Sequence, residues 1–211
     1  MRIFRLIGFS LASAAGLAAS PAIFAAPAPA QLSIGSARAI SLDNQPWEFY
    51  WRRFLTSAEL NGSAEKPDLI LQPLTIWNGK VARGETLSSF GYATYRLKLR
   101  TNMAGERLAL RLPPPLTSYR VFIDGKLMAE TGKPAESAEA CVPRRKSALI
   151  YFTPTGNTIE IIVHVANFLT YKGGLRSNIE LGRAADMQTY GMRYLAIDLF
   201  SIGLIFSIML Y

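Results

Sequence analysis

The stretch GYATYRLKLR, residues 91–100, decides the fold, because the rest of the domain repeats its pattern. Its apolar residues alternate with polar or charged ones; they are Ala93, Tyr95, Leu97 and Leu99. A period of two places the apolar side chains on one face and the polar ones on the other, as in a half-buried antiparallel strand. The stretch therefore predicts a strand whose Tyr95 face lies in a core and whose Arg96 face is polar.

Three further stretches follow the same rule: ERLALRL (106–112), SYRVFIDGKLMAETG (118–132) and NTIEIIVHVANF (157–168). The second contains Asp124-Gly125, a favoured two-residue turn, and so predicts a hairpin. In the third, Ile159, Ile161, Val163 and Val165 share one face. Short strands separated by turn residues predict an all-β sandwich. RRFLTSAELN, residues 52–61, predicts a short helix.

The N-terminal residues have the composition of an export signal. Arg2 and Arg5 precede an apolar stretch rich in alanine and serine, which ends at APA, residues 28–30. A basic start, an apolar middle and a small-residue cleavage site predict a signal peptide over residues 1–30. An uncleaved N-terminal anchor is the alternative. Residues 31–186 would then form one domain in the periplasm or extracellular space, a size usual for a single domain.

The C-terminal residues predict a membrane helix. YLAIDLFSIGLIFSIMLY, residues 194–211, carries one charge, Asp198. A bilayer crossing needs about 17 to 25 predominantly apolar residues. We therefore expect residues 190–211 to form a first transmembrane helix in the bacterial inner membrane. This helix would be truncated before its polar flank. A buried C-terminal helix is the alternative.

Composition argues against several functions. Cys141 and His164 are the only cysteine and histidine, so neither an internal disulfide nor a tetrahedral zinc set of such residues is expected. The sequence shows no nucleophile elbow or phosphate loop, and we expect no catalysis, cofactor or metal. The net charge is +8, but the basic residues are scattered apart from PRRK, residues 143–146. For an exported domain we expect no nucleic acid; anionic ligands or lipid headgroups suit this charge better.

The order of these stretches resembles the galactose-binding-like jelly rolls. Their flanks, WEFYWRRFL (47–55) and NFLTYKGGLRSNIELG (167–182), extend the resemblance, as does the apolar segment behind them. Over residues 47–211 the chain resembles the extracellular sensor domain of bacterial seven-transmembrane receptors with diverse intracellular signalling modules. The resemblance implies a jelly-roll β-sandwich that senses a ligand. It also implies membrane lipid and further transmembrane helices of the same receptor as partners, with any output enzyme beyond residue 211.

Residues suited to a carbohydrate or small anionic ligand occur at turns and on polar strand faces. Aromatic rings stack on planar groups, guanidinium groups bind carboxylate or phosphate, and polar loop residues orient a ligand. The candidates are Trp77, Arg96, Arg120, Asn167, Tyr171 and Arg176. A salt bridge across the sheet is the alternative for Arg96 and Arg120. In WEFYW we expect Trp47 and Trp51 in the core and Tyr50 more exposed.

Three classes of function fit these features. A ligand-sensing domain of a membrane receptor is favoured, because Asp198 inside an apolar helix is costly unless it faces other helices or water. A membrane-anchored carbohydrate-binding module and a protein-docking module are the alternatives. None of the three assigns enzymatic activity to these residues.

Overall fold

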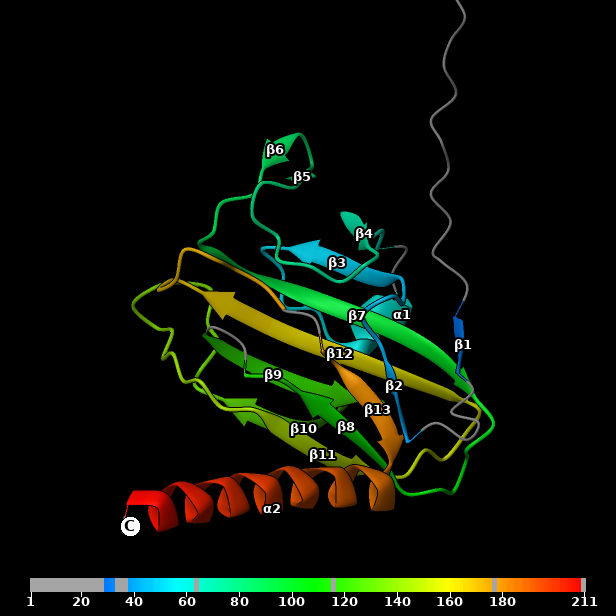
Figure 1. Cartoon of the computed structure of the whole chain (residues 1–211). Helices are drawn as coiled ribbons and strands as arrows, with labels where there is room; N and C mark the ends of the chain where they lie inside the picture. Colours follow the sequence, from blue (N-terminus) through cyan, green and yellow to red (C-terminus); the bar gives the residue numbers. More distant parts are fainter. Residues whose placement is uncertain (1–28, 33–37, 63–64, 115–116, 176–177, 210–211) are drawn as a thin grey trace, which may run out of the picture.

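The computed structural model describes residues 29–32, 38–62, 65–114, 117–175 and 178–209, without the side chains of residues 32, 189–199 and 204. These residues form an all-β jelly-roll sandwich with a long C-terminal helix (Figure 1). Most of the predicted signal peptide, residues 1–28, lies outside the described residues, and so does Arg176.

The larger sheet has seven strands in the order β10-β9-β12-β7-β3-β4, with β1 added alongside β7. Their bounds are Lys126–Thr131 (β10), Ser118–Ile123 (β9), Thr158–Asn167 (β12), Gly91–Thr101 (β7), Trp47–Trp51 (β3), Leu69–Leu71 (β4) and Ala30–Leu32 (β1). The long strands β7 and β12 lie side by side at its centre and pair antiparallel along their whole length. β1 pairs with β7 in parallel.

The smaller sheet has four strands in the order β11-β8-β13-β2, all antiparallel. Their bounds are Ala148–Phe152 (β11), Leu108–Leu112 (β8), Glu180–Arg183 (β13) and Ala39–Ser41 (β2). A separate hairpin is formed by β5, Val81–Ala82, and β6, Glu85–Thr86. The chain crosses repeatedly between the two main sheets, as in a jelly roll.

The core lies between the two sheets and uses the faces that alternation predicts. Tyr95 and Ile161 from the larger sheet and Leu110 from the smaller sheet are fully buried in one continuous apolar cluster. The Asp124-Gly125 hairpin is confirmed: Ile123 pairs with Lys126, and both turn residues have positive φ, 49° and 76°. These are the dihedral angles that a tight hairpin turn requires.

The outer face of the larger sheet is covered, which the alternation does not predict. Residues 52–62 fold over β3, β7 and β12 and end in α1, Ser57–Gly62 (Figure 1). The helix predicted over 52–61 begins only at Ser57, because Thr56 and Glu59 form a reciprocal cap at its start. Under this cover Tyr50 is fully buried with Leu60 and Ile162. The expectation that Tyr50 is the more exposed residue of WEFYW is wrong.

The C-terminal helix α2, Ala184–Met209, follows β13 directly and contacts β13 and β8 near its start. Among the described residues, none of the helices is both long and apolar enough to pass through a membrane. The transmembrane assignment of residues 190–211 stays a prediction.

His164 is an ordinary strand histidine, as expected. Its ring lies under the 52–62 segment, between Phe54 and Phe122, and its Nε2 is 2.9 Å from the carbonyl oxygen of Leu55. Burial lowers the pKa of His164, because the charged ring would lose its hydration. The positive charge of Arg120 acts in the same direction.

We expect this burial to make stability depend on pH. Because the folded pKa lies below the ordinary value of 6.5, the unfolded chain takes up its proton first as pH falls. The His164 contribution is full above about pH 6.5 and is lost as pH falls through the folded pKa. Urea unfolding at about pH 7.5 and 5.5 should show the loss, and His164→Gln should reduce it. A variant with an unchanged pH slope would contradict this assignment.

Candidate functional site

A hollow of about 700 Å³ lies where the loop after β12 meets the loop before β7. We call it the loop-end hollow; it is lined by Ser89, Phe90, Arg145, Leu169, Thr170, Tyr171 and Lys172. The last pair of the β7–β12 ladder, Gly91 with Asn167, brings the two loops together. Loops at the end of a rigid sandwich are a common place for binding residues.

Asn167 shapes the wall of this hollow. Its side-chain amide donates to the carbonyl oxygens of Ser89, at 2.7 Å, and Thr170, at 2.9 Å. Its Oδ1 accepts from the backbone N–H of Thr170 at 3.1 Å. Asn167 is 1% exposed, so these bonds are made within the protein. Asn167, which was predicted to bind a ligand, therefore connects the loop to Ser89.

Trp77 supports the same loop from below. The indole is fully buried and its Nε1 donates to the carbonyl oxygen of Ser88 at 2.9 Å, while its backbone N–H donates to Gly173. A Cβ at Gly173 would come within 2.4 Å of the Trp77 ring. Because glycine has no Cβ, the backbone at Gly173 can pack directly against the Trp77 ring. Trp77 lies in the core, and no face of its ring is an open stacking platform in this structure.

Tyr171, another predicted ligand residue, is exposed in the structure. Asn78 fixes its backbone, donating to the Tyr171 carbonyl oxygen at 2.7 Å and accepting from the N–H of Gly173 at 2.7 Å. Tyr171 is 77% exposed, and the ammonium of Lys172 lies 5.3 Å from its ring centre. A rigid backbone therefore presents a free aromatic ring beside a positive charge.

Residues beyond the predicted ones complete the hollow. Phe90 and Leu169 expose apolar side chains there, and Arg145 adds a second positive charge. Arg145 belongs to the basic PRRK cluster, which was visible in the sequence but could not be placed beside the β12 loop. Within the described residues, the lining includes two cations and no carboxylate. Such a site offers ring stacking and attraction for an anionic group.

Arg96 lies away from the hollow, on the covered outer face of the larger sheet. It is 5% exposed; its Nε donates to Glu160 at 2.8 Å and its Nη1 lies 3.3 Å from Glu48. Its Nη2 donates to Asn61 of α1. Burial and the hydrogen bond to Glu48 raise the pKa of Tyr50, so its hydroxyl remains a donor to that carboxylate at 2.7 Å. Arg96 therefore forms salt bridges across the sheet, the alternative to the predicted role in ligand binding.

Arg120 also forms a cross-strand ion pair. Its Nε lies 2.8 Å from Oε1 of Glu130 on the neighbouring strand, and both side chains are partly exposed. Of the predicted residues, Trp77, Asn167 and Tyr171 come together around one loop. Arg96 and Arg120 lie on the outer face of the larger sheet, away from this loop.

No family model and no curated protein sequence matches the chain. Among solved structures, a family 2 β-galacturonidase from Eisenbergiella tayi bound to galacturonate is 14% identical with a TM-score of 0.47; the match covers 69% of this chain and 24% of that one. A β-glucuronidase from Ruminococcus gnavus in complex with D-glucuronic acid is 11% identical with a TM-score of 0.49, covering 69% and 29%. A calcium-binding mutant of Bacteroides uniformis β-glucuronidase 2 is 18% identical with a TM-score of 0.49, covering 68% and 17%.

The chain thus spans less than a third of the length of each of these enzymes. Likenesses this distant do not indicate what this chain binds or does.

The two arginines give a matched test of burial. Arg96→Ala leaves Glu48 and Glu160 without their buried partner and should lower the free energy of unfolding by about 3 to 5 kcal/mol. Arg120→Ala breaks the more exposed pair with Glu130 and should cost about 1 kcal/mol or less. Urea titrations of the two variants measure both losses. Equal losses would show that the Arg96 cluster does not hold the outer cover in place.

Proposed function

We propose that the sandwich is a ligand-binding domain that takes a small carbohydrate or small anionic molecule in the loop-end hollow. The observation that carries the proposal is the pair of exposed rings, Phe90 and Tyr171, set beside Arg145 and Lys172. A sugar ring has an apolar face that stacks on an aromatic ring, while a carboxylate or phosphate attached to it pairs with the cations.

The rigidity of the loop supports the proposal. Asn167, Asn78 and Trp77 fix its backbone through hydrogen bonds within the protein. A site that is ordered before binding loses less conformational entropy when the ligand arrives. These bonds therefore favour binding at Tyr171 over a purely connecting role for the loop.

Binding, not hydrolysis, is the activity proposed for this hollow. Glycoside hydrolysis requires two carboxyl groups about 5 to 10 Å apart on either side of the bond to be cleaved. Among the described residues that line the hollow there is no aspartate or glutamate.

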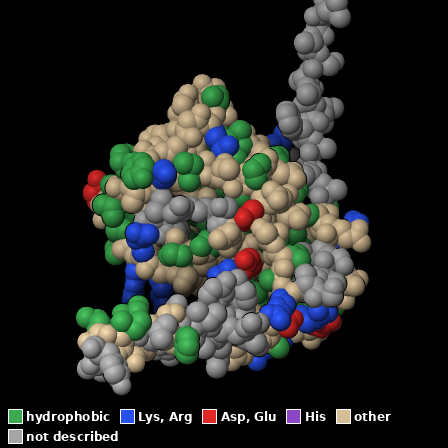
Figure 2. All heavy atoms as spheres, in the orientation of Figure 1, with side chains coloured by type: hydrophobic (Ala, Val, Ile, Leu, Met, Phe, Trp, Pro, Cys, Tyr) green, Lys and Arg blue, Asp and Glu red, His purple; other side chains and the backbone are tan. Residues whose placement is uncertain are grey.

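We further propose that the domain is the extracytoplasmic sensor of a membrane receptor. Apolar side chains near the C-terminal end of α2 are exposed, as the green side chains at that end of the helix in Figure 2 illustrate. They are Phe200, Ile202, Ile205, Phe206, Ile208 and Met209, each between 59% and 80% exposed. Exposed apolar surface of this kind favours contact with lipid or with neighbouring helices. Because β13 runs into α2 without a loop, movement of the sandwich would act directly on the helix.

The hollow can be tested with a panel of neutral and acidic sugars. Galactose, glucose, galacturonate and glucuronate are added to the full chain, and the melting temperature is measured. A ligand at about 100 times its dissociation constant adds about 2.7 kcal/mol of stability. Tyr171→Ala should abolish the shift for every binding sugar, because stacking is lost. Arg145→Gln should weaken the acidic sugars selectively.

Two surface variants serve as controls for these measurements. Leu127→Ala removes an exposed apolar side chain on β10, and Arg83→Gln removes a charge in the β5–β6 turn. Both should keep the shift of the parent chain. If no sugar shifts the melting temperature, or if Tyr171→Ala behaves like Leu127→Ala, sugar binding in the loop-end hollow is ruled out.

The membrane part of the proposal has a separate test. The double variant Ile205→Lys, Phe206→Lys places two charges in the exposed apolar surface of α2, and each costs about 2.5 to 3.5 kcal/mol in the middle of a bilayer. The parent chain should stay in the membrane fraction after alkaline extraction, and the variant should be released. Leu127→Lys on the sandwich is the control and should be retained. Release of the parent chain would rule out insertion of α2.

A further inference from the structure

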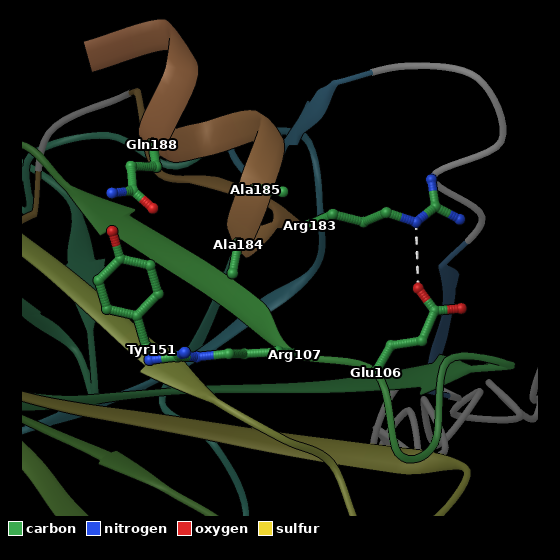
Figure 3. Close-up of a pocket in the computed structure, with 7 residues that line it drawn as sticks. All are labelled: Glu106, Arg107, Tyr151, Arg183, Ala184, Ala185 and Gln188. Atoms are coloured by element: carbon green, nitrogen blue, oxygen red, sulfur yellow. Dashed lines mark hydrogen bonds and ion pairs between the residues drawn. The ribbon is translucent and has the colours of Figure 1, made fainter. Parts of the chain in front are cut away.

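We propose that the chain has a second site, at the root of α2, which binds a phosphate group. A pocket of about 670 Å³ lies between the sandwich and the start of the helix (Figure 3). We call it the junction pocket; it is lined by Glu106, Arg107, Tyr151, Arg183, Ala184, Ala185 and Gln188. It shares no residue with the loop-end hollow, and the proposal does not depend on a ligand there.

The walls of the junction pocket are fixed to one another. The N–H of Ala184, the first residue of α2, donates to the carbonyl oxygen of Arg107 at 2.9 Å. Beside it, the Arg183 guanidinium donates to Glu106 at 3.0 Å. Met187 in the first turns of α2 is buried, and a Cβ on Gly182 would come within 3.1 Å of its side chain. The loop before β8 and the start of α2 therefore hold a set geometry around the pocket.

Arg107 provides the positive charge. Its guanidinium carbon lies 5.2 Å from the centre of the Tyr151 ring, a cation–π contact that positions the side chain without using its N–H donors. In the part of the chain that the structure describes, no carboxylate forms an ion pair with Arg107, since Glu106 pairs with Arg183. The guanidinium is thus held in place with its donors available to an oxyanion.

Two further side chains that carry donors line the same pocket. The hydroxyl end of Tyr151 points toward the Gln188 amide, with Arg107 beneath the Tyr151 ring (Figure 3). Neither group makes a side-chain hydrogen bond to another described residue. A guanidinium, a phenol hydroxyl and a carboxamide thus give the pocket donors on three side chains. A phosphate group, with several acceptor oxygens and a negative charge, matches this set better than a neutral sugar.

The position of the site gives binding a mechanical consequence. Tyr151 and Arg107 belong to the sandwich, while Gln188 belongs to α2, so a bound phosphate contacts both parts. A ligand that binds one arrangement of the two more tightly shifts their equilibrium toward it. The phosphate can come from a phospholipid headgroup or from a soluble phosphate, and the chemistry recognised is the same.

The test uses the full chain in a neutral detergent. Inorganic phosphate is titrated in one arm and binding is followed by calorimetry. In the other arm, the protein is floated with vesicles of phosphatidylcholine alone or of phosphatidylcholine mixed with phosphatidylglycerol. Arg107→Gln should weaken phosphate binding about tenfold, the effect of losing one charge-assisted hydrogen bond. Gln188→Ala should weaken it in the same direction.

Arg83→Gln is the charge-matched control, because it removes one arginine from the β5–β6 turn, at the opposite end of the molecule in Figure 1. It should bind phosphate like the parent chain. Phosphate binding that depends on Arg107 supports a soluble ligand; dependence seen only with phosphatidylglycerol vesicles supports a lipid headgroup. If neither arm shows binding, or if Arg107→Gln and Arg83→Gln behave alike, the proposal is overturned.

Discussion

A buried charge that must be neutralised decides how the larger sheet is built. Arg96 projects from the centre of β7 on the outer face, where α1 and the segment before it exclude water. An isolated guanidinium in such a place would be very unfavourable, so Glu160 and Glu48 supply opposite charges. The same cluster reaches α1 through Asn61, and therefore holds the cover against the sheet. The central strands are thus packed on both faces and form a rigid frame.

That frame positions the two proposed sites at opposite ends of β12. Asn167, its last residue, organises the loop-end hollow through Ser89 and Thr170. Near its first residues, the carbonyl of Pro154 accepts from Gly105, one residue before Glu106 of the junction pocket. A ten-residue strand spans about 33 Å, so the two sites are well separated. A change at one end would have to reach the other through packed strands.

The contrast between the two ends also explains their chemistry. The loop-end hollow combines exposed aromatic rings with cations, which suits a ring that carries an anionic group. At the junction pocket, Arg107 is already stacked on Tyr151, so its guanidinium edge is what remains for a ligand. We propose the first arrangement for a sugar-like shape and the second for a negative charge. Together the two proposals assign one ligand to the loops and another to the start of the helix.

By itself, the sequence determined the strands, the faces that enter the core and the Asp124-Gly125 hairpin, because these depend on neighbours a few residues apart. It also singled out Trp77, Asn167 and Tyr171, which do meet around one loop. Their roles depended on tertiary structure: Trp77 is buried against Gly173, 96 positions along the chain, and only Tyr171 is left open. Periodicity likewise placed Arg96 on a polar face but could not show that α1 covers it. Which distant segment covers a face is decided by packing across the whole fold, and local alternation carries no information about it.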